Sequence, residues 1–145
     1  MFFWRLKNFI RMLTALVLAV GVLFALRLGQ VSRFSAIDGK RTFYLYSASS
    51  QAVIKQKITP LELFFVKGEC VTLTYTDQEQ TLQEILALYK AEILFEEKAG
   101  GTHSYYCNAK SWLQGTRING VVVNLHIAFS EEACAVGSPL IFGGF

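Results

Sequence analysis

The sequence lacks the short motifs that specify a reaction or a cofactor. Its glycine pairs at 100–101 and 143–144 are not followed by Lys-Ser or Lys-Thr, so they indicate turns and not a phosphate-binding loop. Cysteine occurs three times, never as the close couple that structural zinc sites use. His103 and Cys107 lie on one expected strand, roughly 13 Å apart at the rise of a strand. No metal site and no cofactor is therefore expected.

Charge is also scarce, since charged residues make up 17% of the chain and hydrophobic residues 52%. Such an apolar balance indicates a membrane segment, and residues 12–26 form a run of 15 residues without a charge. With its apolar flanks added, and with Arg11 and Arg27 extending to the headgroups, the run approaches the ~20 residues that cross a bilayer. The N-terminal segment is therefore expected to contact membrane lipid.

The segment has two interpretations. An uncleaved anchor is predicted, because the small residues of a signal-peptidase site are missing downstream; a cleaved signal peptide is the alternative, because Arg5, Lys7 and Arg11 form a positive n-region. The short N-terminal tail is most simply left in the cytoplasm, which places the following domain outside a single-pass cell-membrane anchor. The predicted organisation is a cytoplasmic tail and transmembrane anchor (1–29), a linker (30–40) and an extracytoplasmic domain (41–145).

The net charge of +3 divides unevenly along the chain. Residues 1–40 carry six basic residues and one acidic residue (+5), whereas residues 41–145 carry eight basic and ten acidic residues (−2). The basic part suits anionic lipid headgroups, and the domain lacks the positive charge that binding to phosphates requires. Nucleic acid is therefore not an expected partner.

Two capping boxes predict two short helices in the domain. Thr59-Pro60-Leu61-Glu62 predicts a helix over about 60–66 that Gly68 ends, and Thr81-Leu82-Gln83-Glu84 predicts a helix to about Lys90. Alternating or apolar runs between turn residues predict antiparallel strands. These strands are expected in 42–58 (two segments around a turn at 47–50), 68–76, 92–97, 102–109, 119–129 and 133–145. The predicted fold class is α+β: an N-terminal transmembrane helix followed by an antiparallel β-sheet with two short helices packed on one face.

The predicted meander also gives a register for the cysteines. It places Cys107 opposite about Gly120 and Cys134 opposite about Ala128, ~25 Å apart on one strand, which excludes a bridge between these two. Cys70 is left free to pair with either of them.

A cysteine thiolate beside an imidazole is the catalytic arrangement considered for this sequence, with Cys107, His103 and His126 as its candidates. The same register puts His103 across from about Asn124. It therefore predicts a polar cluster of His103, Asn124 and His126 that contains no cysteine. Buried structural cysteines are the favoured interpretation, and a non-enzymatic protein is favoured over an enzyme.

Aromatic side chains supply the candidate binding face, because aromatic residues anchor many interfaces. The alternative is that they form the core of a sheet covered by helices and a loop. The candidate binding residues are Tyr44, Tyr46, Tyr105, Tyr106 and Trp112.

The C-terminal segments VNLHIAFS (123–130) and AVGSPLIFGGF (135–145) resemble the closing part of the YwmB family. These are extracytoplasmic proteins of Gram-positive bacteria whose fold is similar to the TATA-box-binding protein. The resemblance implies a curved antiparallel sheet with helices on one face, an envelope location and a link to cell-wall or sporulation biology. It implies no established catalytic residues, and the chain is considerably shorter than the family's members. The fold name does not imply DNA binding, because residues 41–145 are net negative.

Taken together, these features predict a membrane-anchored extracytoplasmic interaction or structural module of the bacterial envelope with an envelope protein as its partner. The alternative is a small envelope enzyme that uses a cysteine thiolate.

Overall fold

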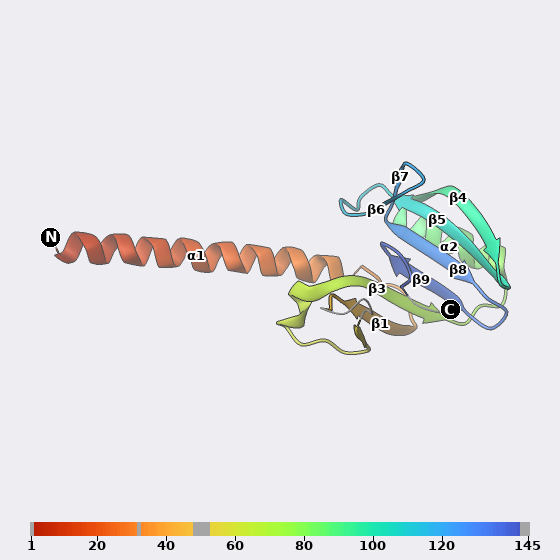
Figure 1. Cartoon of the computed structure of the whole chain (residues 1–145), viewed down its shortest axis with the longest axis horizontal. Helices are drawn as coiled ribbons and strands as arrows, with labels where there is room; N and C mark the ends of the chain where they lie inside the picture. The colour runs from red at the N-terminus through yellow and green to blue at the C-terminus, as the bar shows by residue number, and fades with distance from the viewer. Residues whose placement is uncertain (1, 32, 48–52, 143–145) are drawn as a thin grey trace. The chain divides into compact units, whose positions relative to one another are not determined.

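The computed structural model describes residues 2–31, 33–47 and 53–142. The chain divides into two compact units, residues 1–33 and residues 34–145. The first unit consists of helix α1, and the second is an α+β domain built on an antiparallel sheet (Figure 1).

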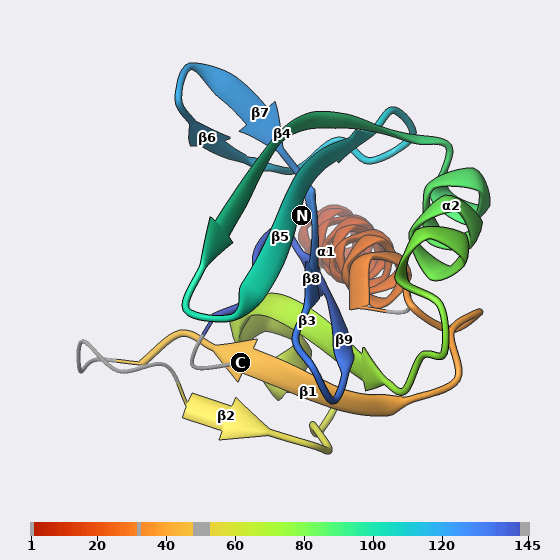
Figure 2. The ribbon, with the colours of Figure 1, turned by 90° about the vertical axis from the view of Figure 1, so that its right-hand side faces the viewer.

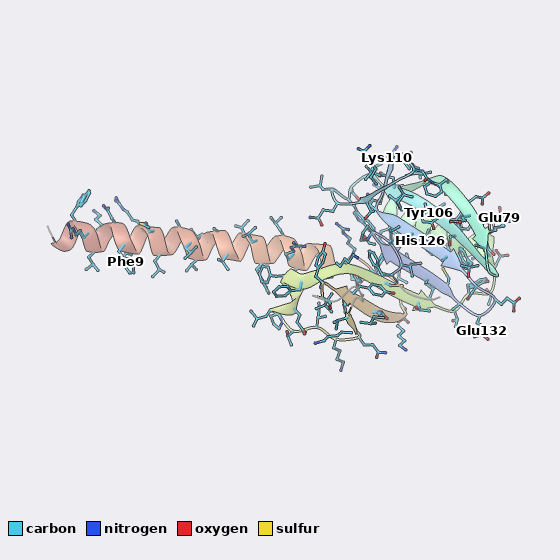
Figure 3. All side chains as sticks on the ribbon, viewed as in Figure 1. Phe9, Glu79, Tyr106, Lys110, His126 and Glu132 are labelled. Carbon is cyan, nitrogen blue, oxygen red and sulfur yellow. The ribbon has the colours of Figure 1, made fainter. Side chains whose placement is uncertain are left out.

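Helix α1 (Phe2–Val31) contains a stretch, Trp4–Gly29, that is long and apolar enough to cross a membrane. At 1.5 Å per residue its 26 residues measure about 39 Å, more than the ~30 Å of a hydrocarbon core. Most of its large apolar side chains are exposed, as Phe9 is in Figure 3. The hydroxyl of Thr14 donates to the carbonyl of Ile10 at 2.9 Å, so this polar group is satisfied within the helix.

The domain contains a seven-stranded sheet in the order β2-β1-β3-β9-β8-β5-β4, in which all neighbouring strands are antiparallel (Figure 2). Its strands are β1 (Lys40–Leu45), β2 (Val53–Lys55), β3 (Val66–Leu73), β4 (Ala91–Ala99), β5 (Thr102–Ala109), β8 (Leu125–Phe129) and β9 (Cys134–Ser138). A two-stranded sheet, a 3-10 helix and an α-helix complete it: β6 (Thr116–Ile118) with β7 (Val121–Val123), η1 (Glu62–Phe65) and α2 (Gln78–Tyr89). The predicted α+β class is confirmed.

Helix α2 covers one face of the sheet, here called the α2 face. Leu82 and Ile85 of this helix pack against the strand residues that point to that face, and Phe34 closes the core from the side. Phe34 is fully buried and meets Tyr89 and Trp112 edge to face at 5.7 and 5.9 Å. Thus part of the segment expected to be a linker (30–40) packs in the core of the domain.

The chain's C-terminal segment crosses the opposite face of the sheet. We call residues 139–142 the strap, and this face the strap face. Two glycines make room for it: a Cβ at Gly137 would lie 2.7 Å from Ile141 Cγ1, and a Cβ at Gly68 would lie 2.8 Å from Phe142 Cε2. Phe142 also packs edge to face on Tyr44 at 5.5 Å. The sequence had indicated that Gly68 ends a helix. Instead, Gly68 lies within strand β3, where the absence of a side chain leaves room for Phe142.

The predicted helix at 60–66 is wrong, because the segment forms only the four-residue 3-10 helix η1. The capping box is half made: the amide of Thr59 donates to Glu62 Oε2 at 2.8 Å, but the Thr59 hydroxyl donates to the same oxygen at 3.1 Å and caps no helical amide. The chain then enters β3 directly at Val66, whose β-branched side chain suits a strand better than a helix.

The second helix is confirmed, but it begins earlier than Thr81. Asp77 is its N-cap and accepts from the amide of Gln80 at 2.8 Å, while the Thr81 hydroxyl donates to the Asp77 carbonyl at 2.7 Å. Lys90 ends the helix with a left-handed backbone (φ 49°). The described residues of the domain thus form one α-helix on the sheet, where the sequence predicted two helices.

The predicted strand 119–129 divides at Asn124. β7 pairs with β6 in the small sheet, whereas β8 pairs with β5 and β9 in the large one. The Asn124 side chain stands in for a strand partner at this junction: Oδ1 accepts from the Ala109 amide at 2.6 Å, and Nδ2 donates to the carbonyls of Ala109 and Trp112 at 3.0 and 3.1 Å. The other predicted hairpins form as β1–β2, β4–β5 and β8–β9. Two parts of the predicted strands and turns lie outside the described residues: positions 48–50 of the predicted turn and positions 143–145 of the last predicted strand.

Because of this division, the predicted register is wrong. Cys107 lies opposite Leu125 and Cys134 opposite Phe129, so the two cysteines face positions four residues apart on β8, where the predicted register had placed them eight residues apart. His103 lies opposite Phe129, not near Asn124.

Candidate functional site

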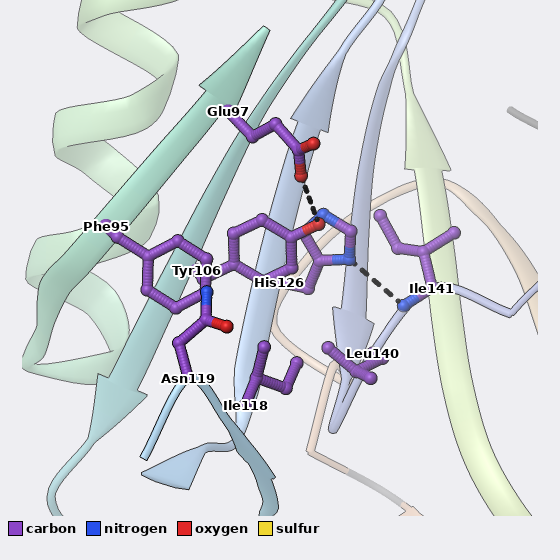
Figure 4. A pocket seen from close by; sticks show the side chains of 8 residues that line it. All are labelled: Phe95, Glu97, Tyr106, Ile118, Asn119, His126, Leu140 and Ile141. Carbon is purple, nitrogen blue, oxygen red and sulfur yellow. Dashed lines mark hydrogen bonds between the residues drawn. The ribbon is translucent and has the colours of Figure 1, made fainter. Parts of the chain in front are cut away.

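Three rings from neighbouring strands stack on the strap face of the sheet. Phe95 of β4 stacks on Tyr106 of β5 at 4.4 Å between ring centroids, and Tyr106 stacks on His126 of β8 at 4.5 Å (Figure 4). The residues are direct cross-strand partners, and a bulge between Ile93 and Phe95 brings Phe95 into line with Tyr106. The stack forms one wall of a cavity.

This cavity has a volume of about 190 Å³. For comparison, an apolar cavity of about 150 Å³ holds a benzene molecule. The strap and the turn of the β6–β7 hairpin form the remaining walls (Figure 4). The lining residues are Phe95, Glu97, Tyr106, Ile118, Asn119, His126, Leu140 and Ile141.

His126 is the buried polar group of the cavity. Its Nδ1 accepts a hydrogen bond from the Ile141 amide at 3.3 Å, which fixes the neutral tautomer with the proton on Nε2. Nε2 is buried and has no hydrogen-bond partner in the part of the chain that the structure describes. Burial lowers the pKa of His126 from 6.5 to about 4, so at neutral pH the ring is an uncharged donor.

Glu97 gives the cavity a negative charge. Its Oε2 accepts from the Tyr106 hydroxyl at 3.4 Å. Burial and the neighbouring Glu97 carboxylate raise the pKa of Tyr106, so this hydroxyl stays protonated at neutral pH. The polar groups that line the cavity are therefore one carboxylate, one phenol, one neutral imidazole donor and the Asn119 amide. Because the carboxylate carries the charge among these groups, the cavity disfavours anions.

Asn119 and Gly120 shape the turn that contributes the outer wall. Both have positive φ (50° and 83°), and they connect β6 to β7. Asn-Gly between apolar residues is the strongest short-range signal of a tight hairpin. This hairpin, and with it the place of Ile118 and Asn119 in the cavity, was not predicted from the sequence, although the signal was present. Phe95 and Glu97 were not predicted as cavity residues either, because their position depends on the bulge in β4.

The predicted polar cluster of His103, Asn124 and His126 is wrong, because the residues lie apart. His126 is on the strap face, and His103 is on the α2 face, where its Nε2 meets Glu96 at 2.8 Å and its Nδ1 meets the Tyr105 hydroxyl at 3.0 Å and Gln78 at 3.1 Å. Asn124 holds the junction between the sheets. Of the two histidines, only His126 lines the cavity.

The three cysteines are buried free thiols. Burial raises the pKa of Cys70 to about 11 and the pKa values of Cys107 and Cys134 to about 12. Cys107 and Cys134 lie in the core on the α2 face, and Cys70 lies against Tyr44 on the strap face. The Cys107, His103 and His126 candidates are thus placed without a thiol–imidazole hydrogen bond among the described residues, and at neutral pH the thiols are protonated.

The five aromatic candidates do not form one surface. Tyr44 and Tyr105 are buried, Trp112 packs on Phe34 and Tyr89, Tyr106 lines the cavity, and Tyr46 is exposed. A role in binding stays a prediction for them. Within the described ranges, no group of three or more His, Cys, Asp or Glu residues is arranged to hold a metal ion.

Comparison with known proteins gives no relative from which a function would follow: no family model, no curated protein and no solved structure matches the chain.

Proposed function

We propose that the chain is a single-pass membrane protein whose α+β domain lies outside the cytoplasm and acts as an interaction module of the bacterial cell envelope. The observation that supports this most is α1, in which Trp4–Gly29 combines sufficient length with apolar side chains that the protein does not bury. Such a surface is stable in lipid and unfavourable in water. Basic residues lie near both ends of this stretch, with Arg5, Lys7 and Arg11 towards its start and Arg27 towards its end, so the orientation is part of the proposal.

The cavity on the strap face is the proposed recognition point of this module. It suits a small uncharged group with an apolar body and one hydrogen-bond acceptor, such as a side chain or backbone carbonyl of an envelope protein. The acceptor would satisfy Nε2 of His126, whose unmade hydrogen bond costs about 1–3 kcal/mol, and the Glu97 carboxylate would disfavour an anionic group. The proposed link to cell-wall or sporulation biology rests on the resemblance of residues 123–145 alone.

The alternative, an envelope enzyme with a cysteine thiolate, has less support. A thiolate nucleophile needs a lowered pKa and access to substrate, whereas burial raises the pKa of all three thiols. Nucleic acid is not proposed as a partner, because residues 41–145 carry a net charge of −2.

Localisation and orientation test the proposal first. Alkaline carbonate extraction of cell membranes should leave the intact, unprocessed chain in the membrane pellet, and protease added to intact protoplasts should digest the domain. Recovery of the unprocessed chain in the soluble fraction, or protection of the domain in intact protoplasts, would contradict it.

Binding at the cavity is tested by capture from native membranes with the anchor intact. Leu140→Trp should fill the cavity and abolish capture of a specific envelope protein, because Leu140 forms part of its lining. The matched control is Leu113→Trp, at a leucine that is 98% exposed away from the lining residues, and it should preserve capture. Equal capture by both variants would show that the cavity is not the recognition point.

A further inference from the structure

A second exposed apolar surface lies at the edge of the sheet where β1, β2 and η1 meet. We call it the apolar tip. Its members are Tyr46, Val53, Ile54, Leu61 and Phe65, which are all exposed. Leu61 and Phe65 are 77% and 57% exposed, and several exposed large apolar side chains in one region are typical of an interaction surface.

Short contacts hold the members of the tip near one another. The amide of Tyr46 donates to the carbonyl of Phe65 at 2.8 Å, and Leu45, the residue before Tyr46, is paired with Val53. An ion pair between Lys55 and Glu62 joins β2 to η1. The tip is therefore a structured surface, and Figure 2 shows β2 beside β1 at the sheet edge that carries it.

The tip is basic as well as apolar. Residues 53–67 carry three lysines and one glutamate (+2), whereas the rest of 41–145 carries five basic and nine acidic residues (−4). Lys57 and Lys67 are exposed, and Lys55 is partly exposed. Apolar and aromatic side chains flanked by lysines are the composition of segments that insert into the headgroup region of anionic bilayers, where tyrosine is also enriched.

The sequence that links α1 to the domain is short. Only Ser32 and Arg33 stand between Val31, the last residue of α1, and Phe34, which is buried in the core of the domain. At ~3.6 Å or less per residue, two residues give little reach. If α1 spans a bilayer, the domain therefore stays beside the lipid headgroups.

We propose that the apolar tip docks on the membrane, with Leu61 and Phe65 in the headgroup region and the neighbouring lysines on anionic headgroups. This inference rests on the proposed function, because it requires α1 to be inserted. Docking gives the anchored domain a second point of attachment to lipid.

The test uses the full chain in vesicles of phosphatidylcholine with and without phosphatidylglycerol. An environment-sensitive fluorophore is attached to Leu61→Cys, to the exposed control Leu113→Cys and to Leu16→Cys in α1. The native thiols are buried, and labelling of the unsubstituted chain checks that they do not react. Docking predicts that spin-labelled lipids quench the Leu61→Cys label several-fold more than the Leu113→Cys label, most strongly with phosphatidylglycerol.

Charge reversal supplies the second arm. Lys57→Glu should reduce quenching at Leu61→Cys, and added salt should act in the same direction, because exposed charges are screened. Quenching of the Leu16→Cys label shows that α1 is inserted in the bilayer. If the Leu61→Cys label is then no more quenched than the Leu113→Cys label, the docking proposal is wrong and the membrane anchor is still supported. Absence of quenching at Leu16→Cys would instead overturn the proposed function.

Discussion

His126 illustrates how one residue's surroundings set its chemistry. The same side chain on an exposed strand would titrate near neutrality, but here the ring is stacked on Tyr106 and hydrogen-bonded to the strap. The fold thus holds the His126 imidazole in its neutral form, with an Nε2–H donor that has no hydrogen-bond partner among the described residues. The consequence is a native state that resists protonation more than the unfolded chain does.

We expect the free energy of unfolding to depend on pH through His126. The unfolded chain binds a proton below pH 6.5 and the folded chain only below about 4, so stability is full above 6.5 and falls as the pH is lowered to about 4. At 1.36 kcal/mol per pKa unit, the loss is roughly 3 kcal/mol. Urea unfolding of the detergent-solubilised chain across this range measures it.

His126→Phe is the matched variant, because phenylalanine keeps the stack on Tyr106 and cannot titrate. Its unfolding free energy should fall less between pH 6.5 and about 4 than that of the unsubstituted chain. Identical pH dependence in the two chains would show that His126 is not the titrating group.

The three thiols should be slow to react with iodoacetamide in the folded chain and fast in denaturant. Burial both blocks access and holds the thiols protonated at neutral pH. Labelling with Cys→Ser controls, followed by mass spectrometry, assigns the rates. A single fast cysteine in the folded state would favour the thiolate enzyme over the module.

Residue types alone do not separate the two histidines or the five aromatic candidates. His103 and His126 both lie in strands, and only the strand register places one on each face of the sheet. That register depends on the break at Asn124, which a run of apolar residues conceals. The buried cysteines, by contrast, could be predicted, since free cysteine in an apolar strand is usually buried.

At the scale of elements, the start of α2 can be tested by its cap. Asp77→Ala should lower the unfolding free energy by about 1 kcal/mol, because it removes the acceptor for the Gln80 amide. Asp77→Asn should restore most of it, and Thr81→Ala should have the smaller effect. A larger loss for Thr81→Ala would place the effective cap where the sequence alone had indicated it.

The strap depends on the glycine beneath it. Gly137→Ala would put a Cβ 2.7 Å from Ile141 Cγ1 and 3.0 Å from the Ile141 amide, so the strap must move. We expect a loss of about 1–3 kcal/mol and faster hydrogen exchange at the Ile141 amide. Gly100→Ala is the control: nothing lies within 4 Å of its added Cβ, so backbone strain can change stability there without changing exchange at Ile141.

Local signals predicted the hairpins better than the long-range pairings. The Gly100-Gly101 turn and the alternating runs predicted β4–β5 and β8–β9, which pair as expected. The pairing of β3 with β9 joins residues more than 60 positions apart, and no local pattern encodes it. The capping box at Thr59–Glu62 predicted a helix over 60–66, but only the four-residue η1 forms. A capping box therefore predicts a helix only where the residues after it also favour helix formation.

At the scale of the whole molecule, membrane retention should depend on the middle of α1. Leu16→Arg with Val20→Arg places two charges near the centre of the span, each costing about 2.5–3.5 kcal/mol there. We expect the double variant to be lost from the carbonate-resistant fraction. Leu6→Arg with Ile10→Arg, near the start of the helix where arginine reaches the headgroups, should be retained. Loss of both double variants alike would show that the effect is not depth in a bilayer.

The strand order has a consequence for how the domain is made. β8 and β9 follow β1 to β5 along the chain, yet they stand between β3 and β5 and so join the two halves of the sheet. These residues leave the ribosome after the strands that they join, and an exported domain would also cross the membrane in that order. The earlier strands must therefore wait, as separate and unfinished hairpins, until β8 and β9 have followed them. Any factor that guards the nascent protein has to act through that interval.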